Sequence, residues 1–233
     1  NRTGGLQRLG YPTMNESCDL PGGAGYQDFE RGSIYWTPTL NRGYTLIGGI
    51  KSKWSATGKE WGALGYPVSD EYYSAGRMVQ DFERGSILYY DTGSYAILSM
   101  VGYGGFAHLG IPKQDTICGL RGDGCYQELE KGTIYWTQAN GAQAVIGGIQ
   151  AKWSATGKEW GSLGYPTSSE YYNGHAITQD YEYGSIHYTN SGNSYYTSSK
   201  MGYVNFSYLG NPRQDTQCGI RNNGCYQIFE RGY

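Results

Sequence analysis

Aromatic and acidic side chains recur in this chain at matching positions, and together they could bind a carbohydrate. Such a site needs rings that stack on the apolar faces of sugars and polar groups that bind hydroxyls. The predicted sugar-binding residues are Trp61, Glu71, Tyr72, Tyr73, their counterparts Trp160, Glu170, Tyr171 and Tyr172, and also Glu16. The structural alternative is that the paired tyrosines alternate between faces of a strand and the tryptophans fill the core.

Catalysis is less well supported by the same residues. A glycosidase needs two carboxylates that face one bond. In this chain the acidic residues recur at equivalent positions of an internal repeat, described below, and such repetition favours multivalent binding. His108, His175 and His187 have no Ser, Cys or metal-ligand spacing around them, which argues against a triad or a metal site. We expect no enzymatic activity and no cofactor. One alternative is a cell-wall hydrolase with a unique site near Tyr183, His187 or the end of the chain. The other is a disc-shaped repeat domain that has a purely structural role or binds a protein.

An internal repeat organises these residues. Five Leu-Gly-x-Pro blocks begin at Leu9, Leu64, Leu109, Leu163 and Leu209. Five Gln-x-x-Glu-x-Gly blocks follow them, at Gln27, Gln80, Gln127, Gln179 and Gln227. The spacing alternates between long and short and predicts one domain, 1–233, with repeats at about 1–48, 49–98, 99–147, 148–198 and 199–233. In most copies a basic residue follows the Glu of the second block, and this pair could bind a ligand. A structural anchor that every unit needs is the better explanation for the recurrence of the pair.

Each copy is expected to form strands with a tight turn and, in the long copies, a short helix. Residues two apart share a face of a strand. The positions predicted to point inward are Trp36, Tyr89, Trp136 and Tyr188. The positions predicted to point outward are Tyr35, Leu88, Tyr135 and His187. Helices are predicted at 50–56 and 149–155, ending at Gly58 and Gly157.

Units of this size cannot bury an apolar face alone, so neighbouring copies must stack. A closed ring would remove exposed sheet edges. The fold class predicted is therefore mainly β with short helices, arranged as a propeller-like, pseudo-five-fold closed disc. The last copy stops at Tyr233, before its second strand, and we expect residues 1–8 to close the gap unless the natural chain is longer.

The cysteines predict two disulfides and an oxidising environment. Cys118 and Cys125, and likewise Cys218 and Cys225, flank six-residue loops rich in Gly and Asn. Zinc is the competing interpretation, but zinc sites favour closer spacing and further ligands. Cys18 has a glycine where its partner should be, and we expect it to be a buried lone thiol or to pair outside this chain. Paired cysteines are typical of secreted proteins.

Charge and hydropathy exclude several partners. With 18 basic and 20 acidic residues, the net charge is −2, so the basic surface that nucleic acid or an anionic membrane requires is missing. No run of 18 apolar residues predicts a membrane span. No leader follows the first residue, which indicates that any signal peptide is already removed or was never part of this sequence.

The two blocks together resemble the LGFP repeat family. The resemblance rests on Leu-Gly-Tyr-Pro followed at a fixed distance by Gln-Asp-Phe-Glu-Arg-Gly and Ile-Tyr-Trp, and it covers all five copies. Ile111 and Asn211 depart from it in place of the aromatic residue. The resemblance implies a module of a secreted actinobacterial or fungal protein, cell-wall polysaccharide such as arabinogalactan as the partner, and a larger enzyme as a possible covalent neighbour.

Overall fold

The computed structural model describes residues 8–202 and 207–232, which are mainly β with short helices. They form two compact units. The first is Asn1–Gly102 with Gln114–Thr116, and the second is Tyr103–Lys113 with Ile117–Tyr233. The segment predicted to close a ring, apart from Arg8, lies outside the described residues. No helix of the described part is both long and apolar enough to cross a membrane.

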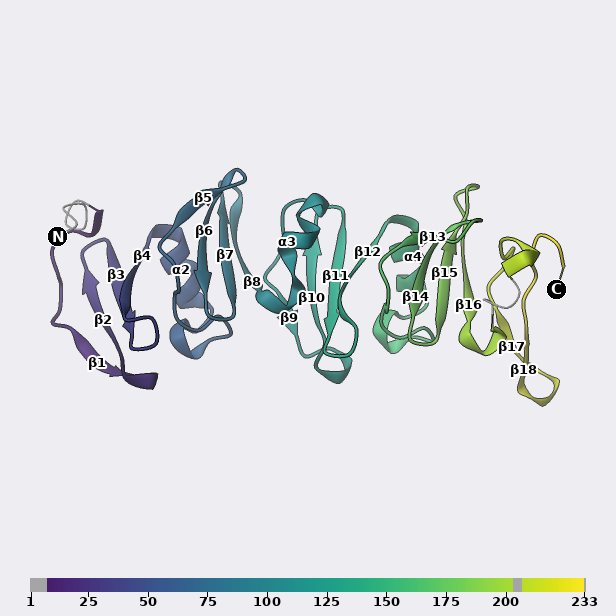
Figure 1. The fold of residues 1–233 in the computed structure, drawn as a ribbon, viewed down its shortest axis with the longest axis horizontal. Coiled ribbons are helices and arrows are strands. Elements are labelled where there is room, and N and C mark those ends of the chain that lie inside the picture. Colours follow the sequence, from purple (N-terminus) through teal and green to yellow (C-terminus); the bar gives the residue numbers. More distant parts are fainter. Residues whose placement is uncertain (1–7, 203–206, 233) are drawn as a thin grey trace. The chain divides into compact units, whose positions relative to one another are not determined.

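The first unit holds two four-stranded antiparallel sheets whose strands follow chain order (Figure 1). The first sheet consists of β1 (Ser17–Leu20), β2 (Ala24–Phe29), β3 (Gly32–Thr37) and β4 (Arg42–Ile47). The second consists of β5 (Tyr72–Ser74), β6 (Arg77–Phe82), β7 (Gly85–Tyr90) and β8 (Gly93–Leu98).

The second unit repeats this pattern and adds a two-stranded sheet. Its strands are β9 (Ile117–Cys118), β10 (Cys125–Leu129), β11 (Gly132–Thr137) and β12 (Gly141–Ile146), then β13 (Tyr171–Tyr172), β14 (Ile177–Tyr181), β15 (Gly184–Tyr188) and β16 (Ser194–Ser198), and finally β17 (Gln217–Ile220) and β18 (Gly224–Tyr226). Each sheet lies within one predicted repeat, and no sheet among the described residues closes on itself. The closed five-fold disc stays a prediction.

Helical elements are short. Two nine-residue helices, α2 (Gly48–Ala56) and α4 (Gly147–Ala155), lie in the long copies, and α3 spans Tyr103–Phe106. The 3-10 turns are η1 (Pro21–Gly23), η2 (Lys59–Trp61), η3 (Ser99–Val101), η4 (Ala107–Leu109), η5 (Arg121–Asp123), η6 (Lys158–Trp160), η7 (Ser199–Met201), η9 (Ser207–Leu209) and η10 (Arg221–Asn223). The predicted helices are confirmed, and the residues expected to end them, Gly58 and Gly157, have left-handed φ of 95° and 96°.

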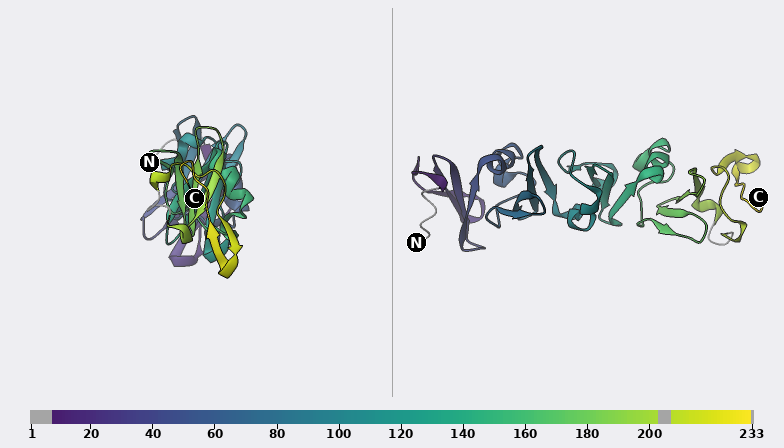
Figure 2. Two further views of the ribbon diagram at one scale, coloured as in Figure 1. Left: turned by 90° about the vertical axis from the view of Figure 1, so that its right-hand side faces the viewer. Right: turned by 90° about the horizontal axis from the view of Figure 1, so that it is seen from above.

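One buried tryptophan joins the two sheets of each long–short pair. Trp153 of α4 is fully buried, and its ring meets Tyr135 of one sheet edge-on at 4.7 Å and lies 5.7 Å from Tyr181 of the next. Its Nε1 donates to the carbonyl of Gly164 at 2.9 Å. Trp54 of α2 repeats this arrangement in the first unit. Figure 2 shows the ribbons of both units from two further sides. Each long copy and the short copy after it therefore form one packing unit, in which two sheets enclose one indole ring.

The predicted assignment of strand faces is wrong. The positions expected to face outward are buried, with exposed fractions of 0–6% for Tyr35, Leu88, Tyr135 and His187. The positions expected to face inward are half-buried or exposed, namely Trp36, Tyr89, Trp136 and Tyr188. The reason is that the strand face carrying Tyr35 and Tyr135 packs against the buried indoles of Trp54 and Trp153, and the sequence does not show where those indoles lie.

Aspartates of copies two, three and five cover the sheet edge of the copy before them. An edge strand leaves backbone N–H groups unpaired, and capping them prevents pairing with another chain. The carboxylate of Asp115 accepts from the backbone N of Ala96 on β8 at 2.9 Å, and its Oδ1 also lies 2.7 Å from Nζ of Lys53. Asp70 and Asp215 accept in the same way from β4 and β16. Copies are thus joined by side-chain bonds to backbone.

The Leu-Gly-x-Pro block and the Gln-x-x-Glu-x-Gly block are hydrogen-bonded to each other. In copy four, Oε2 of Glu182 accepts from the backbone N of Tyr165 at 3.2 Å, and the backbone N of Glu182 donates back to the carbonyl of Tyr165. Gly164 has φ of +71°, and a Cβ there would lie 2.1 Å from that Oε2. The equivalent carboxylates are those of Glu30, Glu83, Glu130 and Glu230. The recurrent Glu is therefore a turn anchor, as the structural interpretation predicted.

Gly164→Ala should cost about 2 kcal/mol of unfolding free energy. The left-handed backbone strains any side chain, and the new methyl would displace the Glu182 carboxylate from its hydrogen bond. Gly174 is the matched control because it has φ of +93° with no atom within 4 Å of a built Cβ. Gly174→Ala should cost only the backbone strain, about 1 kcal/mol. Urea denaturation of both variants measures the loss of unfolding free energy. Equal losses would contradict a structural role for the hydrogen bond between Glu182 and Tyr165.

The two predicted disulfides are present, between Cys118 and Cys125 and between Cys218 and Cys225. Cys18 is free, and it is exposed, so the expectation of a buried thiol is wrong. Its neighbour across β1 and β2 is Gly25, where an added Cβ would lie 3.4 Å from Sγ of Cys18. Copy one thus keeps the geometry of the disulfide without its second cysteine.

Gly25→Cys should therefore form a disulfide with Cys18. Closing a loop of this length restricts the unfolded chain and should raise the free energy of unfolding by about 2 kcal/mol. Mass spectrometry with and without reductant would detect the bond, and denaturation under both conditions would measure its effect. A free thiol at both positions in air-oxidised protein would show that the predicted geometry is wrong.

Candidate functional site

Two identical loops each present a tryptophan to solvent. Trp61 ends η2 and Trp160 ends η6, and their exposed fractions are 76% and 72%. The loop is tightly built, because Gly58 is left-handed and a Cβ on Gly62 would lie 1.8 Å from the carbonyl oxygen of Thr57. A ring held on such a loop is a flat apolar platform at the surface.

The glutamate before each tryptophan was not predicted as part of a site. Glu159 is 7% exposed, and one of its carboxylate oxygens is buried without a hydrogen-bond partner; the same oxygen of Glu60 is in the same state. Burial, and next the charge of Glu159, raises the pKa of Tyr165 to about 12. In the sequence, a Glu between Lys and Trp has the character of a surface residue, so only coordinates reveal that it points inward.

The paired tyrosines divide into two roles. The hydroxyl of Tyr72 donates to Asp81 at 3.0 Å, and the hydroxyl of Tyr171 donates to Asp180 at 3.1 Å. Their neighbours Tyr73 and Tyr172 are 72% and 65% exposed. The first tyrosine of each pair is thus oriented by a carboxylate, and the second is open to solvent.

The three predicted glutamates differ in setting. Glu71 is half-buried, with Arg8 at 3.6 Å, and burial raises the pKa of its carboxyl despite that cation. Burial also raises the pKa of Glu170. Glu16 is exposed near the edge of the first sheet. None of these carboxyls is a described lining residue of the cleft on copy four.

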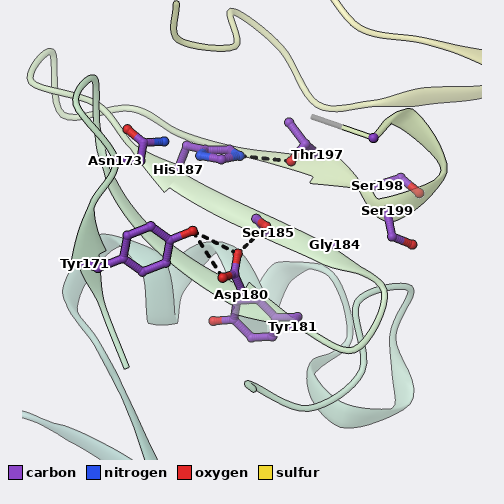
Figure 3. A pocket seen from close by; sticks show the side chains of 11 residues that line it. Tyr171, Asn173, Asp180, Tyr181, Gly184, Ser185, His187, Thr197, Ser198 and Ser199 are labelled. Carbon is purple, nitrogen blue, oxygen red and sulfur yellow. Dashed lines mark hydrogen bonds between the residues drawn. The ribbon is translucent and has the colours of Figure 1, made fainter. Parts of the chain in front are cut away.

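That cleft, of about 570 Å³, lies on copy four and is lined by residues of β13 to β16, of the turn after β13 and of the segment at η7 (Figure 3). Figure 3 shows the hydroxyl of Tyr171 pointing at the carboxylate of Asp180. Ser185 donates to the same carboxylate at 2.6 Å, and the ring of His187 lies 2.9 Å from the hydroxyl of Thr197. The described lining is Tyr171, Asn173, Asp180, Tyr181, Gly184, Ser185, His187, Thr197, Ser198, Ser199 and Gly202.

The cleft contains only one of the predicted residues among its described lining. Tyr171 lines the cleft, while Trp160, Glu170 and Tyr172 are absent from its described lining. Asp180, Ser185 and Thr197 were missed, although the recurrence of Asp two residues before the Glu anchor was a signal for Asp180. No group of three or more His, Cys, Asp or Glu side chains in the described ranges could hold a metal ion.

Residues 9–62 and 109–161 match the family model of the LGFP repeat. The chain carries LGFP repeats. Each match spans a long copy from its Leu-Gly-x-Pro block through the helix to the exposed tryptophan loop, so the loop belongs to the LGFP repeat itself. No curated protein matches the chain.

Proposed function

We propose that the chain is a secreted, non-catalytic module that attaches to cell-wall polysaccharide through several related weak sites. The observation that carries the proposal is the pair of exposed indoles, Trp61 and Trp160. The other four tryptophans are buried or half-buried, which shows that this fold can cover an indole ring. The exposure of these two rings is therefore not imposed by the size of the side chain. Rings on rigid loops are suited to stacking on sugar faces.

Repetition supplies the mechanism. Each aromatic contact to a sugar is weak, but two or more contacts on one body convert later binding events into intramolecular ones. A polysaccharide repeats its own units along the chain, so equivalent loops can bind equivalent sugars. The two disulfides agree with an extracellular setting.

Replacing both Trp61 and Trp160 with alanine should abolish retention on polysaccharide. Each anchor ring contributes roughly 1–2 kcal/mol, so each single variant should lose about tenfold in affinity, while the free energy of unfolding changes by less than about 0.5 kcal/mol. Pull-down on insoluble arabinogalactan, peptidoglycan, chitin and β-glucan measures retention.

The matched controls are Trp61→Tyr and Trp160→Tyr, which keep a ring and should keep most of the binding. A double alanine variant that folds and is retained like the wild type would contradict the proposal. Capture of a protein partner that soluble polysaccharide does not inhibit would favour a protein-binding role in its place.

A further inference from the structure

Copy four contains a buried polar cluster where the other copies are apolar or aromatic. His187 on β15 lies between two threonines, with Nδ1 3.0 Å from Oγ1 of Thr178 on β14 and Nε2 2.9 Å from Oγ1 of Thr197 on β16. The exposed fractions of the three residues are 0–1%. Both ring nitrogens are therefore bound by hydroxyls in the protein interior.

Copy two shows what the fold itself needs at these positions. The strand register pairs Thr178 with His187 as it pairs Val79 with Leu88. Thr197 lies opposite Ser185 as Ile97 lies opposite Ser86. Val79, Leu88 and Ile97 are all buried. An apolar trio is thus compatible with the fold, and burying polar groups there costs desolvation.

The polar cluster faces the cleft described above. His187 and Thr197 line it together with Tyr171, Asp180 and Ser185. The volume of about 570 Å³ is typical of small-molecule sites. Its described lining combines tyrosine rings with hydroxyls, an amide, an imidazole and one carboxylate, and it contains neither Lys nor Arg. That combination disfavours an anion and suits an uncharged ligand with several hydroxyl groups.

We propose that this cleft binds one uncharged sugar unit, as a subsite distinct from the exposed tryptophans. The proposal rests on the proposed function, because it takes the ligand from the same polysaccharide. Asp180 accepts from a sugar hydroxyl with the lone pairs that Tyr171 and Ser185 leave unused. His187 and Thr197 are 0–1% exposed and form the polar floor of the cleft, where they act as positioning residues that hold β15 and β16 beneath the ligand.

The test compares the wild type with the triple variant Thr178→Val, His187→Leu, Thr197→Ile, which rebuilds the apolar trio of copy two. NMR titration with soluble glucose, galactose, mannose, arabinose and N-acetylglucosamine should show saturable binding of at least one sugar to the wild type. The triple variant should bind that sugar at least tenfold more weakly. If the triple variant does not fold, Thr197→Val removes the single hydroxyl with little change in shape.

Polysaccharide pull-down separates this proposal from the proposed function. The triple variant should still be retained on polysaccharide through Trp61 and Trp160, and the double tryptophan variant should still bind the monosaccharide. A wild type that is retained but binds none of the five sugars, or a triple variant that binds them equally well, would overturn the cleft proposal alone. Release of reducing sugar by the wild type but not by the triple variant would also overturn it, because the cleft would then be catalytic.

Discussion

Trp153→Ala should lower the free energy of unfolding by about 3–5 kcal/mol, the range for removing a buried aromatic side chain. The indole is fully buried between Tyr135 and Tyr181, and its loss would leave a cavity between two sheets. It would also leave the carbonyl of Gly164 without its donor. The effect is large because a single side chain serves two sheets at once.

The same repeat offers the control for this prediction. Trp160 lies seven residues later, is 72% exposed, and should cost less than about 0.5 kcal/mol when replaced by alanine. Trp153→Phe should fall between the two, since it keeps most of the volume and loses the hydrogen bond. Urea unfolding monitored by circular dichroism gives the unfolding free energy of all three variants. Similar costs at positions 153 and 160 would mean that the pair of sheets is held together in another way.

Acid should destabilise copy four through His187. Burial lowers the pKa of this imidazole from 6.5 to about 4, so between these values the unfolded chain binds a proton that the folded chain does not. Stability present above pH 6.5 is therefore lost as the pH falls toward 4, by about 3 kcal/mol in total.

The measurement is the unfolding free energy of the wild type and of the apolar triple variant at several pH values across this window. Only the wild type should lose His187-linked stability. The carboxyls of Glu71 and Glu170, whose pKa values burial raises, contribute with the opposite sign, but they are present in both proteins and cancel in the difference. Parallel pH profiles would show that His187 is protonated with little cost in the folded chain.

Local features of the fold could be predicted from the sequence because they depend on spacing. The helices ending before Gly58 and Gly157 and the Cys118–Cys125 pairing follow from residue type and spacing. Burial could not be predicted in the same way. Tyr35 and Trp36 are equally aromatic neighbours, and only the sheet that packs on each face decides which is covered.

For the candidate site, the sequence could predict the exposure of individual side chains but not which side chains meet. Trp61 and Trp160 were chosen because glycines flank them, and the exposure of both rings agrees with that choice. Asp180 and Thr197 were missed because their roles depend on strands that meet only after folding. Position 187 did carry a signal, since it is Tyr, Leu or His among the copies, but that variation was interpreted as exposure.

The indole shared by two sheets has a consequence for inheritance. A gene duplication that copied one sheet alone would leave half of a tryptophan pocket uncovered, whereas a duplication of the whole pair carries both walls of the pocket with it. Selection should therefore retain insertions in steps of two repeats. The segment Lys53–Gly62, which recurs letter for letter at Lys152–Gly161, is the trace that one such step would leave.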